Sequence, residues 1–204
     1  MNSTSETQQD YYQSLYDIAS AVNSTHHSED VLRTMVEMVA TSMESKGCSL
    51  MLLAPDRKTL MHRAAYGLSD WYVRKGPVSA DRSIAEALRG RPVAILNASE
   101  DDRIQYGKQA REEGIASILC VPVMLRDEVV GVIRVYTSEP RHFTSADTYF
   151  VGAVANLGAI ALENATLREA LEKDYQTLQE DMSQWTAALG WEWMVQESVI
   201  PVQE

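Results

Sequence analysis

The stretch from Ile115 to Thr137 reads IASILCVPVMLRDEVVGVIRVYT and decides the fold class. Two runs rich in β-branched residues, Ile115 to Leu125 and Val129 to Thr137, flank the short polar segment Arg126-Asp-Glu128. β-Branched residues favour strands, and a short polar connection between two apolar runs is typical of a β-hairpin. The stretch therefore predicts two long antiparallel strands, and we expect them to lie at the centre of a sheet.

The rest of the chain is predicted to contain a second hairpin and several helices. The apolar runs Cys48 to Ala54 and Thr59 to Tyr66 flank a polar turn, which is typical of a hairpin, and Val93 to Leu96 predicts another strand. Apolar residues at helical spacing predict helices at about 8–23, from Ser28 to near Lys46-Gly47, from about Ser79 to Leu88, between Arg103 and Glu113, and from Thr144 to about 189. Antiparallel hairpins with long helices at both ends predict an α+β domain with one helix-covered sheet.

Composition and charge limit the classes of protein and partner. A chain of 204 residues with 45% hydrophobic content can form one substantial core with an appendage. The formal net charge of −11 disfavours nucleic acid and anionic membranes as partners, because phosphate binding depends on clustered lysine and arginine. The N-terminus has no signal-peptide pattern, and the longest apolar stretch, Val151 to Leu162, is shorter than the roughly 20 residues that span a bilayer. We therefore expect a cytoplasmic protein.

Several short segments together resemble one family, the GAF domains. They are, in chain order, Leu15-Tyr-Asp-Ile-Ala-Ser-Ala-Val22, Ala65-Tyr-Gly-Leu68, Ile118-Leu-Cys-Val-Pro-Val123, Gly131-Val-Ile-Arg-Val135 and Phe143-Thr-x-x-Asp147. The resemblance covers about residues 10–168 and implies a GAF-like, PAS-related α+β fold. It implies a six-stranded antiparallel sheet with terminal helices on one face. On the other face, a roof of short helices and loops, here residues 66–114, is expected to enclose a small-molecule pocket.

The resemblance also guides the expected domain organisation. We expect a disordered N-terminus at residues 1–9 and a GAF domain at 10–168, whose first helix also contributes to a dimer seam. A coiled-coil extension of the last helix follows at 169–189, and a tail containing tryptophan occupies 190–204.

The known cofactor and catalytic signatures of the family are not matched. Of the cyclic-nucleotide signature, Phe143 and Asp147 match only the helix-entry pattern that all family members share. The roof contains no cysteine that could attach a bilin, and the sequence positions of the four histidines do not favour a haem ligand. Cys48 and Cys120 both lie in apolar runs, which disfavours a catalytic thiol, a disulfide scaffold or a zinc cluster. We therefore expect no enzymatic activity, no catalytic residues, no metal and no cofactor.

Two arginines within predicted strands suggest a ligand site. Arg63 and Arg134 place charges on a sheet face, and under the roof they would favour a carboxylate or phosphate ligand. Alternatively, roof acids such as Asp81 or Asp101 neutralise them, or they lie at a solvated edge. Aromatic residues of the roof could line a cavity or fill it. The full candidate set is Arg63, Tyr66, Trp71, Tyr72, Arg82, Ile84, Asp102, Tyr106, Cys120 and Arg134.

A helical seam is predicted along the first and last helices. In the last helix, which Thr144 and Asp147 are expected to cap, apolar residues recur at alternating spacings of 3 and 4, the pattern of a coiled coil. We expect a parallel homodimer, with the stripe folding back on its own domain as the alternative. The predicted seam consists of Tyr11, Leu15, Ile18, Val22, Leu157, Ile160, Asn164, Leu167, Leu171, Leu178, Met182 and Trp185.

These features predict a non-catalytic sensory or regulatory protein. It is expected to bind an unknown small molecule, for which the arginines favour an anion, and to signal in trans through a helical dimer. A kinase or another regulator is the expected kind of signalling partner. The alternative is a ligand-free dimerisation scaffold or adaptor that docks a signalling partner.

Overall fold

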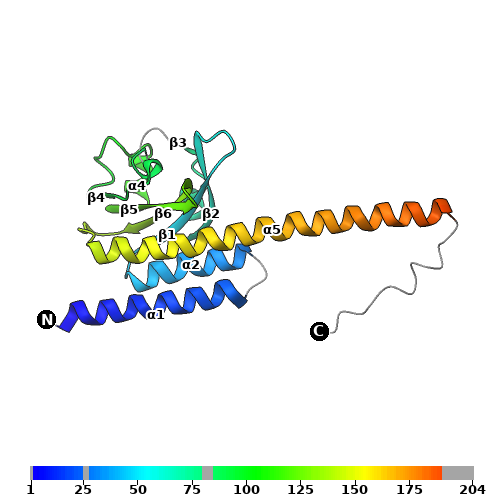
Figure 1. Ribbon diagram of the computed structural model, residues 1–204. Helices are drawn as coiled ribbons and strands as arrows, with labels where there is room; N and C mark the ends of the chain where they lie inside the picture. The colour runs from blue at the N-terminus through cyan, green and yellow to red at the C-terminus, as the bar shows by residue number, and fades with distance from the viewer. Residues whose placement is uncertain (1, 25–27, 80–84, 190–204) are drawn as a thin grey trace. The chain divides into compact units, whose positions relative to one another are not determined.

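The computed structural model describes residues 2–24, 28–79 and 85–189 (Figure 1). The chain separates into two compact units, the first ending at Glu163 and the second beginning at Asn164. The site candidates Arg82 and Ile84 and the tail at 190–204 lie outside the described residues.

The first unit contains the six-stranded antiparallel sheet that the resemblance implied. Its strand order is β3-β2-β1-β6-β5-β4. The two predicted hairpins are present, and their four strands are all internal, while β3 and β4 form the edges. The strands are β1 (Gly47–Leu53), β2 (Thr59–Tyr66), β3 (Val78–Ser79), β4 (Val93–Ile95), β5 (Ser117–Leu125) and β6 (Glu128–Thr137).

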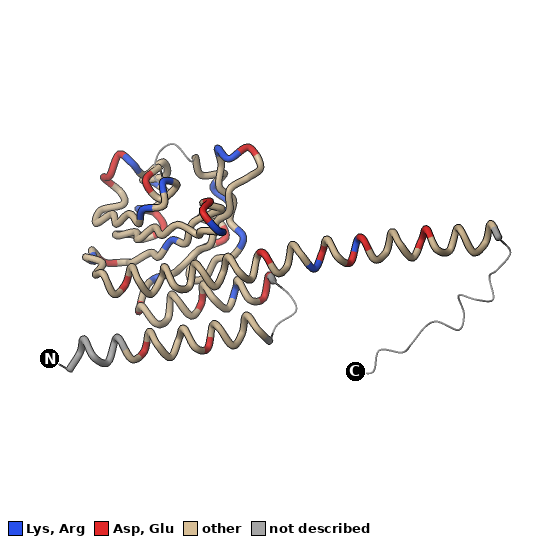
Figure 2. The backbone as a smooth tube through the Cα atoms, in the orientation of Figure 1, with Lys and Arg blue, Asp and Glu red and all other residues tan. Residues whose placement is uncertain are grey.

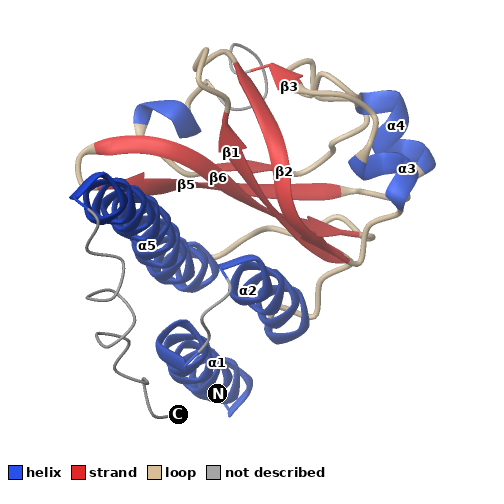
Figure 3. Cartoon of the chain, turned by 90° about the vertical axis from the view of Figure 1, so that its right-hand side faces the viewer, coloured by secondary structure: helices blue, strands red, loops and turns tan. Residues whose placement is uncertain are grey.

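Long helices cover one face of this sheet and short ones lie on the other (Figure 3). The long helices are α1 (Asn2–Ser24), α2 (Ser28–Ser42) and α5 (Ser145–Leu189), of which residues 145–163 belong to the first unit. The short ones are α3 (Asp70–Val73), the 3-10 helix η1 (Ala87–Arg89) and α4 (Gly107–Glu112). We call these sides of the sheet the helix face and the roof face.

Several elements differ from the predictions, including the helix expected from about Ser79 to Leu88, where the described residues form β3 at Ser79 and η1 at Ala87–Arg89. α1 begins at Asn2, within the segment that was expected to be disordered. α2 ends at Ser42, because Glu44 adopts a left-handed φ of 46° and the amide of Ser45 bonds back to Ala40. β3 and α3 were not predicted, since two and four residues are too few to show a period.

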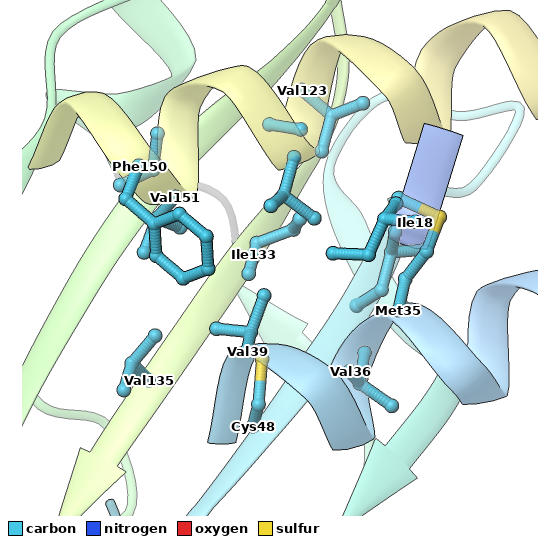
Figure 4. Packing of buried hydrophobic residues seen from close by; sticks show 14 of the residues in the cluster. Ile18, Met35, Val36, Val39, Cys48, Val123, Ile133, Val135, Phe150 and Val151 are labelled. Atoms are coloured by element: carbon cyan, nitrogen blue, oxygen red, sulfur yellow. The ribbon is translucent and has the colours of Figure 1, made fainter. Parts of the chain in front are cut away.

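The helix face carries an apolar core (Figure 4). Alternate residues of the central strands point into it, including Leu50 from β1 and Ile133 from β6. Met35 from α2 and Val154 from α5 meet them, and all four are at most 1% exposed. Burial of apolar surface at this density is the main stabilising contribution in a domain of this size.

The predicted N-cap of α5 is present and also ties down α1. The Thr144 amide donates to Asp147 Oδ2 over 2.6 Å, and the Asp147 amide donates to Thr144 Oγ1 over 3.2 Å. Asp147 Oδ1 also accepts hydrogen bonds from Tyr11 (2.6 Å) and Arg141 (2.9 Å). Burial acts to raise the pKa of Asp147, but the bonds from Tyr11 and Thr144 and the Arg141 charge outweigh it, so the pKa lies below its usual value.

The seam prediction was wrong for α1 and for Leu157. Tyr11 and Ile18 are buried in the core of their own domain, and Tyr11 stacks on Phe150 at 4.2 Å between ring centres. Leu15, Val22 and Leu157 are partly buried against the same core. An apolar stripe shows that a helix has a partner but not which one, and here α1 packs against α2 and α5. The remaining seam residues are exposed: Ile160, Asn164, Leu167, Leu171, Leu178, Met182 and Trp185.

The apolar composition of α5 is explained by packing in its first part. By length and hydropathy, the span Ser145–Ala188 could cross a membrane. Apolar residues of its first part, such as Val151 and Val154, are instead buried against the sheet, as in the core helix of a soluble domain. Residues 164–189 mix acidic and basic side chains (Figure 2).

Candidate functional site

Arg134 lies in the middle of β6 with its side chain on the roof face. It is opposite Ser49 of β1 and Cys120 of β5, and only 4% of it is exposed. Alternation along β6 places Val132 and Tyr136 on the same face, and both belong to the apolar cluster under the roof. A guanidinium stays protonated in proteins, so β6 carries a positive charge into a buried layer.

Lys75 brings a second cation to the roof face just after α3. Its Nζ lies 3.6 Å from the centre of the Tyr72 ring and 5.6 Å from that of Tyr106, and it donates to the Tyr72 carbonyl over 2.9 Å. Burial and the Arg134 charge lower the pKa of Lys75 to about 8, while Glu113 opposes them weakly. The ammonium is therefore easier to deprotonate than that of an ordinary lysine.

His62 of β2 is the third basic side chain of the group. It pairs with Met51 in the sheet and therefore shares the roof face with Arg134. Neither ring nitrogen has a hydrogen-bond partner among the residues that the structure describes, although both atoms are buried. Burial and the charges of Lys75 and Arg134 lower the pKa of His62 to about 4. We call Arg134, Lys75 and His62 the cationic cluster.

Hydroxyl groups and aromatic rings surround the cationic cluster. Ser49 Oγ and Tyr136 OH are 2.9 Å apart, and the Tyr136 ring meets Tyr72 edge-on at 6.1 Å between centres. Tyr106 donates to the Pro77 carbonyl over 3.1 Å. Gly76, with φ of 122°, passes so close that an added Cβ would lie 2.9 Å from the Tyr106 hydroxyl. Position 76, next to Lys75, therefore requires glycine.

The carboxylate of Glu113, whose charge acts on Lys75, has other partners. It accepts hydrogen bonds from the amide and hydroxyl of Ser69 and lies 4.0 Å from Lys46. The Ser69 hydroxyl in turn caps α3 by accepting a bond from the Tyr72 amide. Glu113 therefore fixes the end of α4 against the start of α3 and places Lys75 over the sheet.

The structure brings together four of the ten predicted site residues. Tyr72, Cys120 and Arg134 are buried on the roof face, and Tyr106 packs against the same cluster. The other described candidates lie elsewhere: Tyr66, Trp71 and Asp102 are exposed, and Arg63 is half exposed with its guanidinium 3.9 Å from Glu29 of α2.

The prediction that Arg63 and Arg134 share a face was wrong. A β-bulge interrupts the pairing of β1 and β2, with Leu50 opposite Ala64 but Met51 opposite His62. The extra residue, Arg63, therefore lies on the helix side, where Glu29 is found. His62, which the sequence did not favour as a site residue, takes the place on the roof face. Alternation from the buried Leu60 could have indicated it.

The geometry favours neither a reactive thiol nor a metal site among the described residues. Burial raises the pKa of Cys48 and of Cys120, although the Arg134 charge opposes the effect at Cys120. Neither thiol is therefore prepared to act as a nucleophile. Among the described residues, no group of three histidines, cysteines or carboxylates is arranged to hold a metal ion.

Comparison with known proteins finds a relative that matches most of this chain. It is 24% identical over 166 residues to an Escherichia coli (strain K12) protein, phosphoenolpyruvate-dependent phosphotransferase system. The match covers 80% of this chain but only 22% of that relative's length.

Solved structures show the same fold. The GAF domain of an Acinetobacter phosphoenolpyruvate-protein phosphotransferase matches with a TM-score of 0.66 at 28% identity, covering 76% of this chain and 94% of that one. The corresponding domain from Coxiella burnetii matches with a TM-score of 0.72 at 19% identity, covering 80% and 98%. A sequence model described as the GAF domain matches residues 25–163. The chain therefore belongs to the GAF domain family, whose members are sensory and regulatory domains.

Proposed function

We propose that this protein is a non-catalytic sensory domain that binds an anionic small molecule at the cationic cluster and signals through paired α5 helices. The observation that carries the proposal is the accumulation of basic side chains on the roof face. The Arg134 charge acts on both neighbours, lowering the pKa of Lys75 and of His62 together with their burial. Such a site favours a carboxylate or phosphate group, which would be attracted to the charges of Arg134 and Lys75 and would accept a hydrogen bond from the His62 ring.

The surroundings of the cluster support a ligand with an organic part. Tyr72, Tyr106 and Tyr136 present aromatic surface beside the cations, and the Ser49 and Tyr136 hydroxyls can donate or accept. Ligand sites commonly combine mostly apolar walls with a few convergent polar groups. The buried thiols, with their raised pKa values, support the non-catalytic character.

A thermal-shift screen tests anion binding. Organic acids, nucleotides and neutral metabolites of similar size are compared at constant ionic strength, and a ligand that binds only the folded state raises the melting temperature. We expect shifts confined to anions, and we expect Lys75→Gln to reduce them more than Lys108→Gln, since Lys108 is exposed on α4. If Arg134→Gln and Lys75→Gln leave every shift unchanged, the site lies elsewhere.

Dimerisation is proposed from the second unit alone. Leu171, Leu178 and Met182 are each more than 60% exposed in the isolated chain and follow the spacing of a coiled-coil seam. Pairing two copies would bury this stripe and leave the charged residues of the helix in solvent.

Light scattering tests the dimer. We expect wild-type protein to have a dimer mass at micromolar concentration and the double variant Leu171→Asp/Leu178→Asp to have a monomer mass. Gln176→Asp, which adds one negative charge on the opposite side of the helix from Leu171 and Leu178, is expected to remain dimeric. A monomeric wild-type protein would contradict the proposal.

An adaptor role is the second candidate. The E. coli relative is much longer than the matched region, so the relative has further parts that this chain does not match. A chain of this kind could act on a kinase or another regulator in trans through its exposed helical stripe. A screen without any anion-dependent shift, combined with a dimer mass, would favour this role over ligand sensing.

A further inference from the structure

We propose that Lys75 and His62 take up protons when an anion binds beside Arg134, so that the site responds to pH and to the anion together. This inference rests on the proposed anion site. It assigns two ligand-contacting groups besides Arg134, and it predicts how affinity changes with pH.

The ionisable groups around Lys75 and His62 come from several elements. Arg134 and Tyr136 lie on β6, Cys120 on β5 and Tyr72 on α3, while Glu113 ends α4. Of these, Arg134 is the charge that acts on both Lys75 and His62. Lys75 Nζ lies 3.6 Å from the centre of the Tyr72 ring, and both ring nitrogens of His62 are buried without a hydrogen-bond partner among the described residues. Glu113, the acid that acts on Lys75, is engaged by Ser69 and Lys46.

Lys75 determines how anion affinity changes with pH in the alkaline range. Without an anion, the pKa of Lys75 is about 8, and a negative charge close to Nζ raises it toward the ordinary value. Below that pH the ammonium is already present and binding needs no proton. Above it, binding must recharge the amine, so affinity falls by up to about tenfold for each pH unit.

His62 determines how anion affinity changes with pH in the acidic range. Its pKa of about 4 without an anion leaves the ring neutral at pH 7. A bound anion stabilises the imidazolium, whose two N–H groups both donate. Affinity therefore rises as the pH falls from the pKa of the bound state toward 4, again by up to about tenfold per unit. Both residues shift binding in the same direction, so acid favours the bound state and alkali favours release.

Calorimetry with sulfate tests the inference without interference from the ligand, because sulfate remains a dianion throughout this pH range. Titrations at about pH 5.5, 7 and 9, in pairs of buffers with different ionisation enthalpies, give the number of protons taken up per sulfate bound. We expect each bound sulfate to be accompanied by uptake of a fraction of a proton at pH 5.5 and at pH 9, and of close to none at pH 7. We also expect sulfate affinity to be weakest at pH 9.

Four variants assign the protons. Lys75→Met is expected to abolish uptake at pH 9 while keeping uptake at pH 5.5, and His62→Asn is expected to do the reverse. The matched controls Lys108→Met and His142→Asn, both at exposed positions, are expected to behave like the wild type. Wild-type protein alone suffices to test the coupling if a variant fails to fold.

The outcomes separate this inference from the proposed function. Failure of sulfate to bind at all three pH values would overturn the anion site and, with it, the proton linkage. Sulfate binding with no proton uptake at either extreme would overturn the linkage but leave the anion site standing. Proton uptake that survives at pH 9 in Lys75→Met and at pH 5.5 in His62→Asn would overturn the assignment of the protons to these two residues.

Discussion

The two faces of the central sheet are built from the same strands but from different chemistry. On β6, Ile133 and Val135 enter an apolar core on the helix face, while Arg134 and Tyr136 face the roof. The helix face is closed by long helices with regular packing, whereas the roof face is covered by helices of at most six residues and by loops. One face is therefore an apolar core, and the other combines a second apolar cluster with charged and polar groups.

The contrast shows where function can be located in this fold. Burying a cation is unfavourable unless other groups compensate for it, and the proposed anion site would give the roof face a reason to keep Arg134, Lys75 and His62 together. On the helix face, the buried carboxylate of Asp147 is engaged by Tyr11, Arg141 and Thr144. Its role is to join α1 to α5.

The largest effect is expected on the helix face. Leu50→Ala removes a completely buried side chain from the core and should lower the free energy of unfolding by about 2–5 kcal/mol. Urea denaturation measures it. Met61→Ala on β2, a residue that is 61% exposed, is the control and should change stability by less than about 0.5 kcal/mol. Equal effects of the two substitutions would break the distinction between core and surface.

An intermediate effect on stability is expected when His62 on the roof face is replaced, and this effect is expected only at acidic pH. Its folded pKa of about 4 lies below the ordinary 6.5, so the unfolded chain binds more protons between these values and stability falls as the pH drops through them. His62→Asn removes this part of the acid sensitivity, about 2–3 kcal/mol between pH 6.5 and 4. Urea denaturation at several pH values checks it, with His142→Asn as the control. An unchanged acid profile would contradict the buried, neutral imidazole.

The smallest effect on stability is expected for a polar contact on the helix face, the hydrogen bond from Tyr11 to Asp147. Tyr11→Phe removes the hydrogen bond to Asp147 and should cost about 1–2 kcal/mol at pH 7. Because the folded pKa of Asp147 is lowered, the stability it contributes is lost as the pH falls through that pKa, and the difference from wild type should narrow in acid. The neighbouring Tyr12, which is 69% exposed, provides the control Tyr12→Phe, for which no change is expected.

Much of the fold was predictable because its elements have strong local signals. Both hairpins, the order of the long helices and the cap formed by Thr144 and Asp147 follow from periodicity and spacing. The face of Arg134 also followed, since alternation places it opposite Ile133 and Val135, whereas the sequence left open whether it is buried or lies at a solvated edge.

The remaining site could not be predicted, for physical reasons. The bulge that moves Arg63 to the helix side depends on pairing with β1 and leaves no mark on the local sequence. Lys75 reaches the sheet from the end of a four-residue helix, which is too short to show a period. The stripe on α1 showed that this helix needs a partner, but its choice of α2 and α5 over a second copy depends on three-dimensional packing.

Crystallography with selenate, an anomalous scatterer of the same shape as sulfate, tests the central claim most directly. We predict a selenium peak on the roof face within hydrogen-bond reach of Arg134 and Lys75, and the loss of that peak in Lys75→Met crystals grown under the same conditions. Selenate bound only at exposed lysines and arginines, with the space beside Arg134 filled by the protein's own side chains, would contradict the claim that this face of the sheet is an anion site.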